Sequence, residues 1–240
     1  MNESATVRAE YERLHEALDD ANLDAIAGIA GCVPAIGRLN YVDDATLAAL
    51  VDRMSIAEGC RVLDLGCGRG FLGRWLFAHR RRVAYTAMDY CRPALDSVRR
   101  SIPDADVVWG DVNSMTDGSY EAIFAIESIW AVDDALAVRL RAALVPGGRI
   151  AISISSLDAS HDGRIDTTIA SLRNAGFDVE NVAFAAGHSE VVGRLCAALM
   201  IEPPSDPWVR ERMTAEAVLT LAALRDGAFR SDLLLAVART

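Results

Sequence analysis

Lysine is absent from this chain of 240 residues, and all of its positive charge comes from 24 arginines. A lysine Schiff base is therefore excluded as a catalytic intermediate. The 34 acidic residues exceed the arginines by ten, which gives a net charge of −10. Nucleic acids and anionic membranes are bound through clustered cations, so this balance argues against either as the main partner. The one run of arginines, residues 80–82, is expected to be a solvated loop.

Cysteine is scarce, and its spacing carries no metal or disulfide signature. The five cysteines never occur as C-x-x-C, so we expect no metal site and no disulfide framework. Residues 1–4 are polar and acidic, unlike the start of a signal peptide, and no apolar run approaches the ~20 residues of a membrane span. These features predict a protein of the reducing cytoplasm.

The segment at residues 62–71, V-L-D-L-G-C-G-R-G-F, reads as an apolar strand, a glycine-rich turn and the start of a helix. Glycines let the backbone adopt positive φ and leave no Cβ in the way of a ligand. The first amides of the following helix are unsatisfied donors. The turn therefore indicates a nucleotide pocket.

Two glycine patterns overlap in this turn. Residues 68–73 satisfy G-x-G-x-x-G, in which the helix N-terminus receives the pyrophosphate of a dinucleotide. Gly66, Gly68 and Gly70, counted from Asp64, instead satisfy D-x-G-x-G-x-G. This pattern resembles motif I of the class I S-adenosylmethionine (SAM) methyltransferases, where the glycines receive the amino-acid part of SAM and the acid helps to hold its ammonium group. A carboxylate beside a pyrophosphate would be unfavourable, which favours the methyltransferase reading.

Two later strands carry polar residues suited to an adenosine ligand. Residues 83–89 read as a strand ending in Asp89, 19 residues after Gly70, and a carboxylate there can accept both ribose hydroxyls. Residues 105–112 read as a third strand with Gly-Asp near its end, which resembles the family's adenine-contacting segment. The cofactor-binding residues implied by the resemblance are Asp64, Gly66, Cys67, Gly68, Gly70, Asp89, Tyr90, Asp111 and Val112.

The remaining core segments follow in the order of the same family. Residues 120–127 read as a fourth strand ending in a carboxylate, and residues 144–152 begin with L-V-P-G-G, which resembles the family's Leu-x-Pro-Gly-Gly signature before the fifth strand. We expect a sixth strand near residues 177–185. The resemblance covers roughly residues 59–186 and implies an α/β fold, with a Rossmann-like, doubly wound, seven-stranded sheet that is mostly parallel and has an antiparallel last strand.

The expected organisation has four parts: a helical N-terminal cap at residues 1–57, a SAM-binding core at 58–186, a helical lid at 187–226 and the final strand at 227–240. The cap contains Tyr11, His15 and Tyr41, with breaks expected at Gly28, Gly31, Pro34 and Gly37 and a helix capped by Asp43 or Asp44. Asp206-Pro207 should begin a lid helix. Its apolar face is formed by Val209, Met213, Ala217, Leu221 and Leu224. This face predicts packing on neighbouring helices, the seam of a homodimer, or a lid.

Ligands of open α/β sheets bind at the carboxyl ends of the strands, which places Glu127 on the acceptor side. Beside an apolar wall with Trp130 its pKa should rise toward that of a general base, although it could equally stabilise a cationic substrate or hydrogen bond locally. The dipeptide Glu127-Ser128 resembles the corresponding segment of small-molecule methyltransferases, including sugar O-methyltransferases and terpene-diphosphate C-methyltransferases. Several sugar-modifying relatives have histidine next, whereas this chain has Ile129; Asp158 and His161 are the candidate replacements.

These motifs predict a SAM-dependent methyltransferase that modifies an O, N or C atom of a small metabolite. The expected substrate-binding residues are Tyr11, Tyr41, Trp130 and His188. Nucleic-acid amino methyltransferases carry an Asn/Asp-Pro-Pro-aromatic motif after the fourth strand, and residues 125–128, A-I-E-S, lack it. Two alternatives stay open: an NAD(P)-dependent oxidoreductase and a SAM-binding protein without catalysis.

Overall fold

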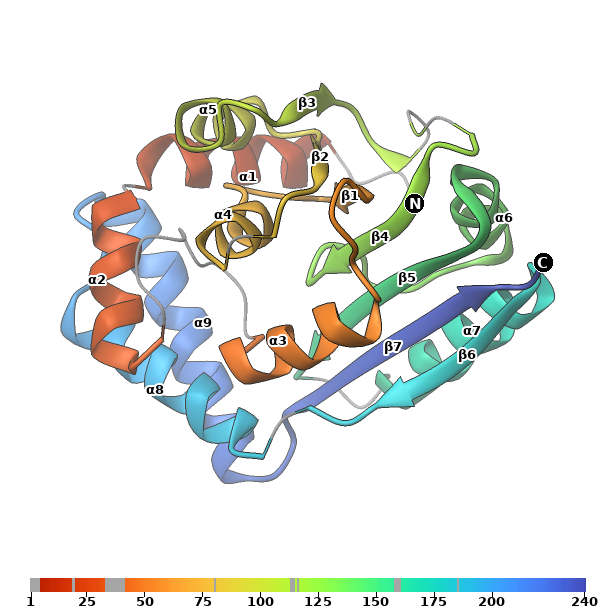
Figure 1. Cartoon of the computed structure of the whole chain (residues 1–240). Coiled ribbons are helices and arrows are strands. Elements are labelled where there is room, and N and C mark those ends of the chain that lie inside the picture. Colours follow the sequence, from red (N-terminus) through yellow and green to blue (C-terminus); the bar gives the residue numbers. More distant parts are fainter. Residues whose placement is uncertain are drawn as a thin grey trace.

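The computed structural model describes residues 5–18, 20–32, 42–79, 81–112, 115, 117–157, 161–184 and 186–240. Within them lies one seven-stranded sheet with the strand order β3-β2-β1-β4-β5-β7-β6 (Figure 1). The strands are β1 (Arg61–Leu65), β2 (Ala84–Asp89), β3 (Asp106–Trp109), β4 (Tyr120–Ile126), β5 (Leu144–Ser156), β6 (Phe177–Val182) and β7 (Arg230–Ala238). Strands β1 to β5 pair in parallel, and β7 runs antiparallel to both β5 and β6. The expected Rossmann-like sheet with an antiparallel last strand is confirmed.

The sheet reverses its winding at β1. This strand pairs with β2 on one side and with β4 on the other, so the chain moves outward from β1 in both directions. In doubly wound folds the ligand crevice opens at this switch point, outside the carboxyl ends of the strands. Leu65, Asp89 and Ile126 end the three strands concerned. The glycine-rich turn after β1 therefore starts at the mouth of the crevice.

Helices cover both faces of the sheet because side chains alternate along each strand. Val62 of β1 packs in a core with α3 (Asp44–Arg53), α4 (Phe71–Ala78) and α5 (Arg92–Ser101). The next residue, Leu63, packs in a second core with α6 (Asp134–Ala143) and α7 (His161–Asn174). The cores on the two faces hold the crevice residues at fixed positions.

Helices α2 (Asp20–Ala30), α8 (His188–Ile201) and α9 (Pro207–Arg225) lie together beside the sheet (Figure 1), and their side chains form a third apolar cluster. Helix α1 (Ala5–Ala17) contributes Leu14 and Ala17 to a fourth, smaller cluster. Ile26 of α2 packs with Leu195 of α8 and Ala217 of α9. Val209 packs instead with Leu18 and Leu23. The predicted apolar face of α9 is thus covered within the chain, as the packed-helix interpretation expected.

Two of the predicted helix caps are confirmed. Asp43 caps α3 by accepting a hydrogen bond from Thr46 N at 2.8 Å, and Asp206 caps α9 by accepting from Val209 N at 2.9 Å. Gly28 was predicted to break a helix, yet it lies inside α2. A Cβ at Gly28 would meet nothing within 4 Å, and glycine keeps ordinary helical geometry where the flanking residues pack. The predicted breaks at Pro34 and Gly37 lie outside the described residues.

The Pro-Gly-Gly segment, residues 146–148, lies within β5, whereas the sequence predicts it before the strand. Helix α6 ends at Ala143, and β5 begins at the next residue rather than after the glycines. The register between β4 and β5 shifts there, because Tyr120 pairs with Leu144 whereas Ala122 pairs with Arg149. The segment is therefore a bulge at the start of a strand.

No helix in the described part of the chain combines the length and apolarity that a membrane crossing requires.

Candidate functional site

The turn after β1 depends on glycine for its shape. Gly66, Gly68 and Gly70 have φ values of 69°, 52° and 81°, in the left-handed region that a side chain disfavours. A Cβ on Gly66 would lie 2.4 Å from Ser128 Cβ, which a real structure cannot accommodate. Gly66 N also donates to Met88 O at 2.8 Å. Contacts with the end of β2 and with the segment after β4 therefore restrict the turn to one conformation.

Asp89 lies beside the turn as predicted. Its Oδ2 accepts a hydrogen bond from Gly68 N and its Oδ1 accepts one from Cys91 N, both at 2.8 Å. The carboxylate also lines a cavity of about 280 Å³ that begins at the turn. Tyr90, the next residue, lines the cavity too, with its ring edge-on to Tyr11 at 6.3 Å between centroids. Asp89 and Tyr90 therefore both line the cavity, and their contacts with the ribose and adenine of a cofactor stay predictions.

Asp64 is buried beneath the turn and does not line the cavity. Its Oδ2 accepts a hydrogen bond from Tyr85 OH at 2.6 Å, and burial raises the pKa of the carboxyl to about 7. The observed partner of Asp64 is therefore a protein hydroxyl, and its predicted contact with the SAM ammonium stays a prediction. Asp111 and Val112 also lie outside the lining; the carbonyl of Val112 accepts from Arg139 Nε at 3.1 Å.

A cavity of about 280 Å³ connects the glycine turn to the third helical cluster. Its floor contains the turn, Asp89 and the segment after β4, whereas its roof comes from α1, α2, α8 and α9. The roof residues are Tyr11, Leu14, His15, Leu23, Ile26, Leu195, Cys196, Leu199, Met213, Glu216 and Ala217. The predicted cap and lid segments therefore meet over the cofactor turn.

Glu127 follows β4 and lines the same cavity. Its φ of 53° lies in the left-handed region, which is rare for a residue with a side chain and marks functional sites when the surroundings enforce it. Glu127 N donates to Ser153 Oγ at 2.9 Å, and Oε1 accepts from Ser155 Oγ at 2.9 Å. Burial raises the pKa of Glu127, and hydrogen bonds from the side chains of Ser155 and Ser153 to its carboxyl oppose part of that rise. Glu127 thus lines the cavity, and its role on the acceptor side stays a prediction.

The structure does not bring His161 to the cavity. Its Nε2 lies 2.8 Å from Asp232 Oδ2, and the ring is buried at the start of α7. The second core, which contains Ile154 and Ile165, lies on this face of the sheet, opposite the first core with α3 and α4. The prediction that His161 acts as a base is therefore unsupported by its position. Asp158 lies outside the described residues.

Of the four predicted substrate residues, two line the cavity, one lies outside its lining, and one falls outside the described residues. Tyr11 and Trp130 line the cavity, and Trp130 is 55% exposed at its rim. His188 lies at the start of α8 outside the lining; its ring stacks on Phe184 at 3.9 Å, and Nδ1 lies 3.1 Å from Asp43 Oδ2. Tyr41 falls outside the described residues.

Arg69 is a site residue that the sequence analysis did not assign. It is buried within the glycine turn, where its Nε donates to Asp20 Oδ1 at 2.7 Å and its Nη1 donates to His15 O at 2.9 Å. Arg74 of α4 donates to the other oxygen of Asp20 at 3.0 Å. The turn is thereby tied to the junction of α1 and α2. The place of an arginine between the motif glycines was the only signal available in the sequence.

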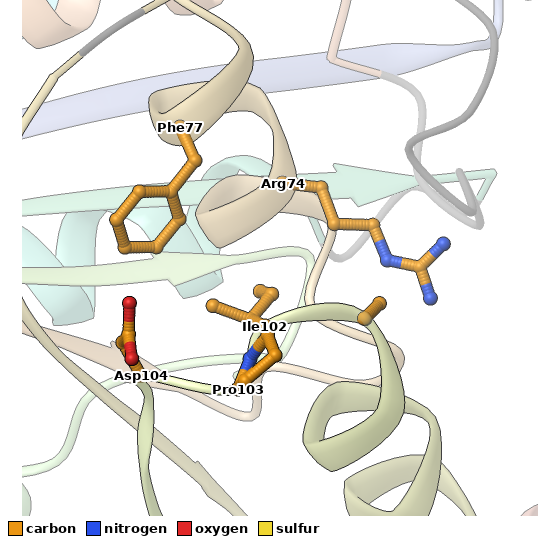
Figure 2. A pocket seen from close by; sticks show the side chains of 6 residues that line it. Arg74, Phe77, Ile102, Pro103 and Asp104 are labelled. Carbon is orange, nitrogen blue, oxygen red and sulfur yellow. The ribbon is translucent and has the colours of Figure 1, made fainter.

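A second cavity of about 340 Å³ lies between α4 and the end of α5 (Figure 2). Figure 2 shows the guanidinium of Arg74 extending away from Phe77 and Asp104. That guanidinium donates to Asp20 and Ser97, and Ser101 Oγ donates to Ser97 O at 2.8 Å. This hollow lacks convergent polar groups and is not a ligand site by its chemistry. In the described part of the chain, no group of three or more His, Cys, Asp or Glu side chains is arranged to hold a metal.

The residues of the first cavity fit SAM. Gly66 and Gly68 line the cavity and have no side chain, so a ligand can approach their backbone closely. Asp89 offers carboxylate oxygens to a diol. His15 Nδ1 is buried without a hydrogen-bond partner in the described structure, at the wall of the same cavity.

Comparison with known sequences gives the same result as this geometry. Residues 62–148 match the family described as "Methyltransferase domain". Trans-aconitate 2-methyltransferase of Delftia acidovorans is 31% identical over 131 residues, covering 52% of this chain and 49% of that protein. Ribosomal RNA small subunit methyltransferase C of Chromohalobacter salexigens is 37% identical over 133 residues, covering 50% and 39%. The chain thus spans half or less of the length of these relatives.

Comparison with solved structures shows the fold. Geranyl diphosphate C-methyltransferase from Streptomyces coelicolor A3(2) superposes with a TM-score of 0.69 at 14% identity, covering 99% of both chains. The cyclopropane synthase MmaA2 from Mycobacterium tuberculosis gives 0.72 at 12% identity, covering 92% of this chain and 99% of that chain. Residues 62–148 are thus similar to a methyltransferase domain, and the sheet order and the glycine turn are those of the class I SAM-dependent methyltransferase fold.

Proposed function

We propose that this protein transfers a methyl group from SAM to a small-molecule acceptor bound in the 280 Å³ cavity. One observation carries the proposal: a single cavity contains both the cofactor turn with Asp89 and the acceptor-side carboxylate Glu127. Bound SAM supplies an electrophilic methyl group, and the glycine turn and Asp89 are the residues that would hold its amino acid and its ribose.

The chain's own contribution is to position the acceptor and to exclude water. The roof helices cover the turn, and reactions of this kind gain much of their rate from alignment at near-attack distance. Glu127 is the group able to take a proton from the acceptor, because burial moves its pKa upward from the usual range of a glutamate. Ser155 holds its carboxylate at 2.9 Å, which fixes the direction in which it faces.

The lining favours an acceptor that is largely apolar and neutral or cationic. Leucine, isoleucine and methionine side chains form most of the roof, and Glu127 and Glu216 add carboxylates. The guanidinium of Arg69 is already paired with Asp20. A tricarboxylate such as the substrate named for the trans-aconitate relative, or a diphosphate, would meet carboxylates without a compensating cation. The net charge of −10 and the roofed cavity likewise argue against ribosomal RNA.

Incubation of the protein with metabolite extracts and SAM carrying an isotopically labelled methyl group tests the proposal. Mass spectrometry should reveal a labelled product, and its identity names the acceptor and the accepting atom. Trans-aconitate is the matched acidic substrate and should remain unlabelled. If calorimetry showed no affinity for SAM or S-adenosylhomocysteine while NAD(P) bound tightly, the oxidoreductase alternative would replace this proposal. Cofactor binding without any labelled product would support the non-catalytic alternative.

A further inference from the structure

His15 is a buried histidine on the inner side of α1. Its side chain is 7% exposed, and it lines the cavity beside the glycine turn. A Cβ built on Gly68 would lie 3.8 Å from His15 Cε1, so the ring packs directly over the turn. Nδ1 has no hydrogen-bond partner in the described structure. A buried polar atom of this kind is costly to remove from water unless a hydrogen-bond partner satisfies it.

The position of the ring is enforced by the protein. Arg69 Nη1 donates to the backbone carbonyl of His15 at 2.9 Å, and Asp20 holds the same guanidinium at 2.7 Å. Arg74 binds the second carboxylate oxygen of Asp20 at 3.0 Å. The chain therefore uses three charged side chains to keep α1 at the turn while leaving one imidazole nitrogen unsatisfied. His161 Nδ1 and His188 Nε2 are also buried without a partner in the described structure, but of these three histidines only His15 lines the cavity, where a ligand can reach its ring.

The charged groups that line the cavity indicate which part of a ligand His15 Nδ1 could bind. Asp89, Glu127 and Glu216 all line the cavity and would repel an anion, whereas the turn end carries Arg69, His15 and the N-terminus of α4. SAM has one anionic group, the carboxylate of its amino-acid part. Because Arg69 is engaged with Asp20, His15 is the side chain at this end with a donor position to offer.

We infer that His15 binds the carboxylate of the cofactor's amino-acid part through Nδ1. The inference rests on the proposed function, because it requires SAM or its product S-adenosylhomocysteine in this cavity. It adds a contact from the N-terminal helix to a site whose sequence motifs all lie between residues 64 and 112. Helix α1 would then act as part of the cofactor site as well as its cover.

The protonation of His15 should change when the contact forms. Burial, aided by the positive charge of Arg69, lowers the pKa of the free imidazole to about 4. A bound carboxylate favours the protonated ring and raises that pKa. By linkage, affinity should increase as pH falls through the pKa of the bound form. The other titratable or charged groups that line the cavity or lie on adjoining segments are Arg8, Glu10, Tyr11, Glu12, Arg13, Glu16, Asp20, Cys67, Arg69, Arg74, Asp89, Tyr90, Cys91, Glu127, Cys196 and Glu216.

Isothermal titration calorimetry with two ligands separates this contact from general damage to the pocket. S-adenosylhomocysteine contains the amino-acid part, whereas 5′-methylthioadenosine lacks it. In His15→Ala, the affinity for S-adenosylhomocysteine should fall about 10- to 100-fold, which is the effect of one hydrogen bond to a charged group. The affinity for 5′-methylthioadenosine should change by less than about threefold. Glu16→Ala, a neighbouring exposed position on α1, is the matched control and should alter neither.

A second variant tests the role of the proton and guards against misfolding. His15→Asn keeps a neutral hydrogen-bonding group near the position of Nδ1 but does not titrate. It should retain most of the affinity at pH 8 and lose the gain that the wild type shows at pH 5.5. Unchanged S-adenosylhomocysteine affinity in His15→Ala, or equal loss for both ligands, overturns the inference and leaves the proposed function standing. Failure of the wild type to bind S-adenosylhomocysteine overturns both.

Discussion

His188 Nδ1 lies 3.1 Å from Asp43 Oδ2, and this contact joins the start of α8 to the start of α3 across 145 residues of sequence. Asp43 also accepts hydrogen bonds from the backbone and hydroxyl of Thr46, at 2.8 and 2.6 Å. Burial alone would raise the pKa of Asp43, but the hydrogen bonds from His188 and Thr46 outweigh it and lower the pKa to about 2. One carboxylate thus caps a helix and anchors the inserted helices to the core.

Two substitutions of Asp43 should separate its capping of α3 from its contact with His188. Asparagine caps helices about as well as aspartate, so Asp43→Asn should lose chiefly the contact between the carboxylate and the His188 ring, whereas Asp43→Ala should also lose about 1 kcal/mol of capping. The folded-state pKa is depressed, so the carboxylate's contribution is complete above pH 3.8 and is lost as pH falls toward 2. Urea unfolding at pH 7 and pH 3 measures both effects. Equal stability of the two variants at pH 7 would contradict the capping role.

Replacement of Glu127 should impair methyl transfer without impairing cofactor binding. Glu127→Gln keeps the shape and the hydrogen-bonding capacity toward Ser155 but removes the basic oxygen. Turnover should fall about 100-fold if the carboxylate takes the acceptor's proton. Wild-type activity should rise with pH through a pKa that burial has raised, and the variant should lack that rise. The matched control is Glu121→Gln, on the same strand but paired with Arg61 at the surface. A fully active Glu127→Gln would rule out the role as a base.

Gly66→Ala should be far more damaging than Gly59→Ala. Both glycines have positive φ, 69° and 77°, so either alanine incurs the left-handed backbone cost of about 1–2 kcal/mol. A Cβ at Gly66 would also lie 2.4 Å from Ser128 Cβ, whereas a Cβ at Gly59 would meet nothing within 4 Å. Thermal unfolding and calorimetry of S-adenosylhomocysteine binding should show the difference. Adding Ser128→Gly should recover part of the lost stability; no recovery would show that the clash is not the cause.

Asp64→Asn should change how stability depends on pH. Burial raises the folded-state pKa of Asp64 to about 7, and nearby Asp89 adds to the rise while the hydrogen bond from Tyr85 opposes it. A carboxyl with a raised pKa stabilises the fold in its protonated form, so this contribution is lost as pH rises from about 4 through 7. The asparagine variant should lose less stability than the wild type between pH 5 and pH 8 in urea unfolding. Asp117→Asn, at an exposed loop position, is the control.

The strands and the cofactor turn were predictable because their signals are local. An apolar run that ends at a glycine or an acid, as at Leu65 and Asp89, predicts a strand and the edge at which it ends. The pairing of Arg69 with Asp20 and the packing of His15 over Gly68 depend on how the N-terminal helices dock, which no local pattern specifies. His161, predicted as a candidate base, lies outside the cavity lining, because proximity in sequence to the end of β5 does not say to which face of the sheet the chain turns.

The left-handed backbone of Glu127 carries a last consequence for anyone engineering greater thermal tolerance. Glycine at this position would relax the main chain and should raise the melting temperature, yet it would delete the one carboxylate that ends β4 at the cavity. A screen that selects only for heat resistance would therefore favour Glu127→Gly and recover a more heat-stable protein that lacks the proposed base.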